Sequence, residues 1–200
     1  MENHHTAHAF ARAGADPEIL VIRNLTPADV TASCEALVKA IGESQIVMLP
    51  GGFSGGDEPD GSAKFIASFF RNPAVTEAVR ELLQKRDGLM LGICNGFQAL
   101  IKLGLVPYGD IRPITSYDPT LTFNTIGRHQ SMLVRTRIAS TGSPWLSNCA
   151  VGDEHTVAIS HGEGRFVAPQ NVLDELVRNG QVATQYVDLD GQPTMDQRYN

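Results

Sequence analysis

The sequence predicts an α/β fold, in which a doubly wound and largely parallel sheet carries helices on both faces. Two observations predict this class. Short apolar runs alternate with longer segments in which apolar residues recur at helical spacing. Glycine-containing turns follow two of these runs, at residues 51–52 and 92–96. Because ligands of such sheets gather at the carboxyl ends of the strands, both turns are candidates for function.

In the first half of the chain, helices and strands are predicted in alternation. Residues 3–13 form a helix closed by Gly14, and a second helix starts after the cap Thr26 with Pro27 in its first turn. The predicted helices here are 3–13, 27–41, 62–70 and 73–85. The predicted strands are the short apolar runs 19–23, 45–49 and 88–91.

In the second half, a helix over residues 97–103 is followed by a change of pattern. Strands are predicted at 129–138, 155–160 and 182–187, with a helix at 170–179. Repeats, linkers and low-complexity segments do not interrupt the chain, so one domain spanning residues 1–200 is expected.

The composition indicates an ordinary globular protein. The net charge of -6 argues against a nucleic-acid surface. Apolar runs are all shorter than the roughly 20 residues that cross a bilayer, and the polar start does not resemble a signal peptide, so a cytoplasmic location is expected. The three cysteines, Cys34, Cys94 and Cys149, are odd in number and widely separated, which indicates reduced thiols. Cys34 and Cys149 are expected to be structural or incidental.

Cys94 has the setting of a nucleophile elbow. The apolar run 89–91 enters Gly92-Ile93-Cys94-Asn95-Gly96, and the helical run 97–103 leaves it. At the start of a helix, backbone N–H groups and the helix dipole favour a thiolate, and the N–H after the cysteine suits a developing oxyanion. The motif alone also fits a buried structural cysteine between two glycines.

Surrounding residues extend the motif to C-x-G-x-Q, formed by Cys94, Gly96 and Gln98, which is similar to the elbow of class I glutamine amidotransferases. Longer strings, MLPGGFSGGDEPDGSAKFIA, GLMLGICNGFQALIKLGLVPYG, LTFNTIGRH, SHGEGRF and QVATQYVDLDGQPTMDQRYN, resemble the glutaminase domains of phosphoribosylformylglycinamidine synthases that carry glutaminase and synthetase on one polypeptide. The resemblance implies a flavodoxin-like sheet.

The resemblance also implies a function and its residues. Cys94 attacks the side-chain amide of glutamine, and the N–H groups of Gly52 and Asn95 form the oxyanion hole. Ammonia passes to the synthetase domain of the same polypeptide, which uses ATP and Mg²⁺ to make the amidine in purine biosynthesis. The glutaminase domain itself is expected to need no cofactor or metal. Gln98, one helical turn after Cys94, is expected to hold the substrate.

The loop of residues 51–61 follows a predicted strand. A phosphate-binding interpretation is weak, because G-K-[ST] is absent and the acidic residues Asp57, Glu58 and Asp60 repel anions. A plain surface turn is the alternative to the role that the resemblance gives to Gly52.

His161 and Glu163 have the H-x-E spacing of the amidotransferase triad. In the family that this chain resembles, however, the triad pair comes from a separate H-[PS]-E segment near the carboxyl end. Ser160, His161, Gly162 and Glu163 are therefore expected to bind glutamine. The sequence is expected to lack the family's first strand and that final segment, and the chain alone is expected to be nearly inactive.

Two alternatives to this function stay open. One is a catalytically incompetent fragment that acts only as an interaction domain, and the other is a different cysteine hydrolase on a similar sheet. His4, His5 and His8 suggest a metal site, but a solvated helix start explains them better because carboxylate and cysteine ligands are absent around them.

Overall fold

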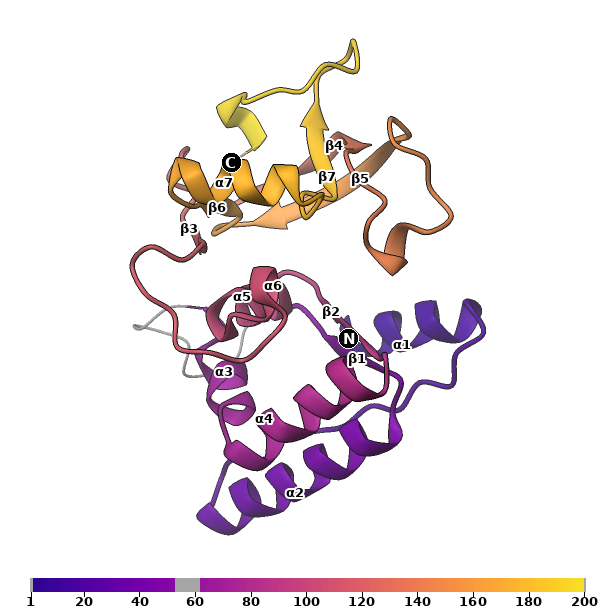
Figure 1. Ribbon diagram of the computed structural model, residues 1–200, viewed down its shortest axis with the longest axis vertical. Coiled ribbons are helices and arrows are strands. Elements are labelled where there is room, and N and C mark those ends of the chain that lie inside the picture. Colours follow the sequence, from indigo (N-terminus) through magenta and orange to yellow (C-terminus); the bar gives the residue numbers. More distant parts are fainter. Residues whose placement is uncertain (1, 53–61, 200) are drawn as a thin grey trace. The chain divides into compact units, whose positions relative to one another are not determined.

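The computed structural model describes residues 2–52 and 62–199, and the chain divides into two compact units (Figure 1). The first unit is Met1–Ile114 and the second is Thr115–Asn200. Within the described residues, none of the helices combines the length and apolar character that crossing a membrane requires. Cys34, Cys94 and Cys149 are all free thiols.

The first unit combines helices with a pair of strands. Its strands β1 (Ile46–Leu49) and β2 (Leu89–Gly92) are parallel, with Leu49 opposite Gly92. Its helical elements are α1 (Glu2–Arg12), α2 (Pro27–Glu43), α3 (Lys64–Phe70), α4 (Pro73–Arg80), the π-helical turn η1 (Glu81–Lys85), α5 (Asn95–Leu103) and α6 (Leu105–Tyr108). The predicted helices and two of the three predicted strands of this half are therefore confirmed.

The core of the first unit lies between its helices and the strand pair. Helix α2 packs against α4, while α5 packs against α3, β1 and β2 (Figure 1). Val75, Leu82 and Leu103 have 0% of their surface exposed, and Ile41 has 1%. Burial of such aliphatic side chains contributes about 1.5–3 kcal/mol each, so this cluster supports the position of the turn between β2 and α5.

Helix α2 has defined signals at both ends. At its start, the Thr26 hydroxyl accepts from the Asp29 N–H while the Asp29 carboxylate accepts from the Thr26 N–H, which forms a capping box. At its end, the guanidinium of Arg86 donates to three carbonyls, those of Ile41, Gly42 and Ser44. These bonds satisfy acceptors that lack partners inside the helix.

The predicted strand at residues 19–23 is wrong. This segment is extended, with Leu20 and Ile22 packed against the core, but it joins no strand among the described residues. The backbone of Arg23 instead bonds with a side chain of α2: its N–H donates to Ser33 Oγ at 2.9 Å, and the Ser33 hydroxyl donates back to its carbonyl at 3.0 Å. The apolar character of this run therefore reflects the packing of Leu20 and Ile22 against the core.

The second unit is built on antiparallel strands. Its three-stranded sheet has the order β5–β4–β7, formed by β5 (Glu154–His161), β4 (Gln130–Ile138) and β7 (Thr184–Val187). A separate antiparallel pair joins β3 (Thr120–Thr122) to β6 (Arg165–Val167). The remaining elements are η2 (Pro144–Leu146), α7 (Gln170–Arg178) and η3 (Gln197–Tyr199).

The α/β class is confirmed, and the two units differ in how their strands pair. Parallel pairing occurs between β1 and β2, whose connection contains helices, whereas β4 and β5 are joined by a loop with only one short 3₁₀ turn. A connection without a crossover helix favours an antiparallel neighbour. The predicted strands and helix of this half are confirmed, while β3, β6 and α6 were not predicted.

Candidate active site

Cys94 lies in a sharp turn between a strand and a helix. Strand β2 ends at Gly92, helix α5 begins at Asn95, and Cys94 between them has φ 53° and ψ -114°. A positive φ is unfavourable for a residue with a side chain and marks stored backbone strain, which clusters at functional sites. The Cys94 side chain is exposed. The predicted strand, turn and helix are thus present, with a strained and accessible thiol at the apex.

Two glycines make this turn sterically feasible. A Cβ atom built on Gly92 would lie 2.6 Å from the carbonyl oxygen of Gly96, and one on Gly96 would overlap the backbone of Leu49. Helix α5 therefore approaches β1 and β2 too closely for any side chain at these positions. The close approach explains why the elbow motif has glycine on both sides.

Asn95 and Gln98 occupy the first turn of α5. Asn95 is 5% exposed and is the first residue of the helix, while Gln98 is half-buried. The Gln98 N–H donates to the Cys94 carbonyl at 3.0 Å, which closes the first turn onto the cysteine. The amino end of α5, which is the positive end of the helix dipole, therefore lies next to Cys94.

Gly52 lies just after the end of the neighbouring strand β1. It follows the end of β1 in a bend with φ 109°, a conformation that favours glycine. Leu49 and Gly92 are paired at the ends of parallel strands, and the Ile93 N–H donates to the Leu49 carbonyl at 3.1 Å. Gly52 and Cys94 therefore both come just after the carboxyl ends of two paired parallel strands. The remaining predicted loop residues, 53–61, lie outside the described residues.

The second unit carries four of the predicted glutamine-binding residues at the end of β5: Ser160, His161, Gly162 and Glu163. Strand β5 ends at His161, so the first two belong to the strand and the others to the turn. The Ser160 hydroxyl is 3.0 Å from His129 Nε2. Nδ1 of His161 is 2.8 Å from the side-chain oxygen of Asn124, so an amide orients this imidazole.

Asn124 holds the turn after β5 together. This 3% exposed residue donates through Nδ2 to the carbonyls of Arg128 and His161, and its Oδ1 accepts from the Gly164 N–H. These three bonds fix the orientation of the amide. Oδ1 therefore accepts from His161 Nδ1, which carries the proton. Nε2 of His161 is a buried acceptor without a hydrogen-bond partner among the described residues.

Asn124 is a site residue that was not predicted from the sequence. It lies 37 residues before His161, within a string quoted only for its resemblance. A single asparagine between a short strand and a glycine turn looks like any turn former. Only the tertiary contacts show that its side chain orients the histidine.

Burial lowers the pKa of His161 below its ordinary value of 6.5, and the nearby His129 lowers it further. Folding therefore favours the neutral imidazole. Above pH 6.5 both folded and unfolded chains hold His161 neutral, and its contribution to stability is complete. As the pH falls from 6.5 toward the lowered folded pKa, the unfolded state gains a proton first and the free energy of unfolding decreases.

We expect this loss of stability to be measurable by urea unfolding between about pH 8 and about pH 5. In His161→Gln the free energy of unfolding should depend less steeply on pH than in the wild type. His8→Gln, in the first unit, is the matched control and should keep the wild-type slope. Equal slopes in wild type and His161→Gln would contradict the lowered pKa.

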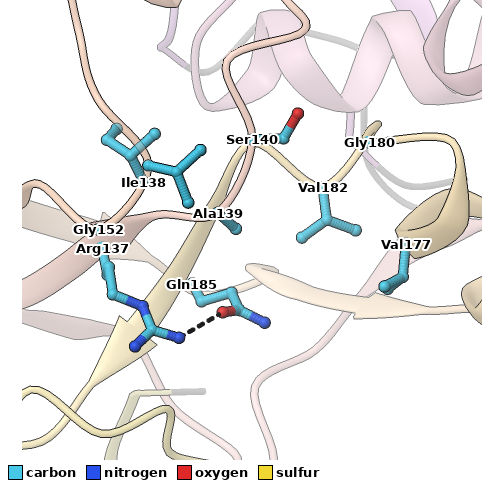
Figure 2. A pocket seen from close by; sticks show the side chains of 10 residues that line it. Arg137, Ile138, Ala139, Ser140, Gly152, Val177, Gly180, Val182 and Gln185 are labelled. Atoms are coloured by element: carbon cyan, nitrogen blue, oxygen red, sulfur yellow. Dashed lines mark hydrogen bonds between the residues drawn. The ribbon is translucent and has the colours of Figure 1, made fainter.

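A cavity of about 420 Å³ lies in the second unit, and its lining includes none of the candidate residues named above. Figure 2 shows its walls, in which the side chain of Arg137 points toward Gln185 and donates to its Oε1 at 3.4 Å. Apolar side chains from several elements form the remainder of the wall, together with small residues. They are Ile138, Ala139, Ser140, Val151, Gly152, Val177, Gly180 and Val182.

Comparison with known families identifies the class of protein. Residues 2–200 match the model of the CobB/CobQ-like glutamine amidotransferase domain. The chain therefore belongs to the CobB/CobQ-like glutamine amidotransferase family.

Several similar proteins are named phosphoribosylformylglycinamidine synthase subunit PurQ. The one from Methanococcus maripaludis S2 is 34% identical over 191 residues, which cover 94% of this chain and 63% of that protein. The one from Frankia casuarinae is 35% identical over 188 residues, covering 94% and 67%. The chain thus spans slightly less than two thirds of the length of the Methanococcus relative.

A solved structure of PurLQS from Thermotoga maritima is similar in fold. The TM-score is 0.63 at 22% sequence identity, and the match covers 92% of this chain and 68% of that chain. At this identity the likeness shows the fold alone.

Proposed function

We propose that this chain is the glutaminase component of a phosphoribosylformylglycinamidine synthase. The observation that carries the proposal is Cys94, an exposed thiol held at positive φ between β2 and α5 in a member of a glutamine amidotransferase family. The relatives' shared name supports the choice of this synthase among the amidotransferases.

In the proposed reaction, the Cys94 sulfur attacks the side-chain amide carbon of glutamine. The resulting oxyanion is stabilised by the N–H groups of Gly52 and Asn95, and the C–N bond then breaks to leave a thioester. The leaving nitrogen takes up the thiol proton and departs as ammonia. Water hydrolyses the thioester, which releases glutamate and restores the thiol.

We assign substrate binding to Gln98, Ser160, His161, Gly162 and Glu163. The Nδ1–H tautomer and lowered pKa of His161 support a neutral acceptor at Nε2 in place of a positive charge. The Asn124 contacts keep that tautomer fixed, which is a positioning role. Glycine at 164 supports the same arrangement, because a Cβ atom there would overlap the His161 ring.

The ammonia is proposed to serve a synthetase that converts formylglycinamide ribonucleotide to the amidine with ATP and Mg²⁺. We place ATP and Mg²⁺ in the synthetase and propose a cytoplasmic location, in keeping with the three free thiols. The synthetase belongs to the same polypeptide in the multidomain enzymes that the sequence resembles, whereas the relatives are named as subunits.

The test uses the complete gene product together with its synthetase. Glutamate release and amidine formation are measured with glutamine as the nitrogen source, and amidine formation is measured again with ammonium chloride. We expect both nitrogen sources to support synthesis. If ammonium supports synthesis but glutamine is not hydrolysed, the chain is an interaction module. If another amide or ester is hydrolysed in preference to glutamine, it is a different cysteine hydrolase.

A further inference from the structure

We propose that Cys149, Asp153 and His155 form a binding site for one zinc-class divalent cation. Cys149 and Asp153 lie in the loop between β4 and β5, and His155 is in β5 itself. Within the described residues, these three form a cluster of metal-ligating side chains whose ligand atoms all lie within 4.8 Å of one another. The site belongs to the second unit and includes none of the residues assigned to glutamine chemistry.

The size of the cluster suits a tetrahedral cation. Bonds of about 2.3 Å to sulfur and about 2.0–2.2 Å to nitrogen or oxygen place neighbouring tetrahedral ligands about 3.3–3.8 Å apart. Ligand atoms already within 4.8 Å need only small side-chain rotations to reach that spacing. Cys149 is half-buried, while Asp153 and His155 are exposed, so a cation can enter from solvent.

Hydrogen bonds hold the loop that carries Asp153 in place without the cation. The Asp153 N–H donates to the Ala150 carbonyl at 3.0 Å, and the Ala150 N–H donates to Asp153 Oδ2 at 2.7 Å. The loop is anchored to β4 because the Gly152 N–H donates to the Ile138 carbonyl at 2.9 Å and the Ile138 N–H donates to the Asp153 carbonyl at 2.9 Å. One carboxylate oxygen therefore orients Asp153, and the second oxygen remains available as a ligand.

The donor set selects the kind of cation. A thiolate and an imidazole favour zinc and similar transition metals, whereas magnesium and calcium prefer sites made of oxygen. Three protein ligands leave the fourth tetrahedral position to water. On binding, the Cys149 thiol gives up its proton and the sulfur bonds to the metal, so affinity should increase with pH.

Cation binding would also fix one wall of the cavity. Val151 and Gly152 line that cavity and lie between two of the ligands in the sequence. A cation bound to Cys149, Asp153 and His155 would tie both sides of this short turn to β5.

The proposal is tested on the full untagged chain, stripped with a chelator and kept reduced. Titration with Zn²⁺ should give one tight equivalent and a higher melting temperature. Titration with Co²⁺ should give a thiolate-to-cobalt charge-transfer band, which reports the sulfur ligand directly. Loss of outer-shell partners alone costs about 10–100-fold in metal affinity, so Cys149→Ser and His155→Gln should each weaken Zn²⁺ binding at least about 100-fold.

Two controls separate this site from others. The variant with His4→Gln, His5→Gln and His8→Gln removes the histidines of α1 and should keep the tight equivalent. Cys34→Ser removes a different thiol and should keep the cobalt band. The circular dichroism spectrum of each stripped variant checks that it is folded.

Absence of a tight equivalent in the wild type would overturn the proposal. So would a cobalt band that survives Cys149→Ser, or binding that is lost only with the histidines of α1. None of these outcomes bears on glutamine hydrolysis, so this inference and the proposed function can fail independently.

Discussion

Replacing Cys94 with alanine is expected to abolish glutamine-dependent amidine synthesis in the complete enzyme and to leave ammonia-dependent synthesis intact. The substitution removes the atom that forms the thioester, so no covalent route to glutamate remains. Losing a nucleophile in hydrolases of this kind lowers kcat by about 10⁴-fold or more. Glutamate release and amidine formation, each measured with glutamine and with ammonium chloride, check the two halves of the expectation.

Labelling gives an independent measurement of the same prediction. A glutamine-analogue electrophile should modify Cys94 in the wild type, as identified by mass spectrometry of digested protein. Cys34→Ala is the matched control, because Cys34 is half-buried on α2 and packs against the core of the first unit. It should keep both labelling and activity. Undiminished labelling or glutamate release in Cys94→Ala would contradict the nucleophile assignment.

Gly96→Ala is expected to destabilise the first unit by about 3 kcal/mol, the upper end of the usual cost of overpacking. The added methyl group would overlap the backbone of Leu49, and backbone atoms of a strand in a packed core cannot rotate away. Helix α5 would have to move away from β1, which would also disturb the turn that holds Cys94. Urea unfolding followed by circular dichroism measures the loss.

Gly42→Ala is the matched control for this prediction. Gly42 lies in α2, and a Cβ atom there would have no heavy atom within 4 Å. Alanine at a helical position without a clash is neutral or stabilising by up to about 1 kcal/mol. Equal stability of Gly96→Ala and Gly42→Ala would show that α5 does not pack against the end of β1.

Features fixed by neighbouring residues were predicted from the sequence. The elbow around Cys94 was predicted because an apolar strand, two glycines and a helical run are local signals. The start of α2 was predicted for the same reason, since the cap Thr26 and Pro27 in the first turn are adjacent in the sequence, and the structure adds the capping box with Asp29. The roles assigned to Gly52, Asn95, Gln98 and the 160–163 segment remain predictions.

The partners of extended segments were not predictable in this way. Residues 19–23 are an apolar run of strand length, but the backbone of Arg23 bonds to Ser33 on a helix. The second unit is antiparallel, while the alternation of strands and helices indicated a largely parallel sheet. The pattern of apolar residues indicates which side chains face a core. Strand pairing depends instead on which other segment of backbone lies alongside the strand.

By itself, the sequence determined the class of fold, the elbow and the membership that its motifs imply. Only the tertiary structure decided that Asn124 orients His161, and that Cys149, Asp153 and His155 meet at the start of β5. The physical reason is that a side-chain cluster depends on the register of β4 with β5 and on turns closed by backbone hydrogen bonds. Those bonds join segments that are far apart in the sequence, and the pattern of one segment does not predict its contact with the other.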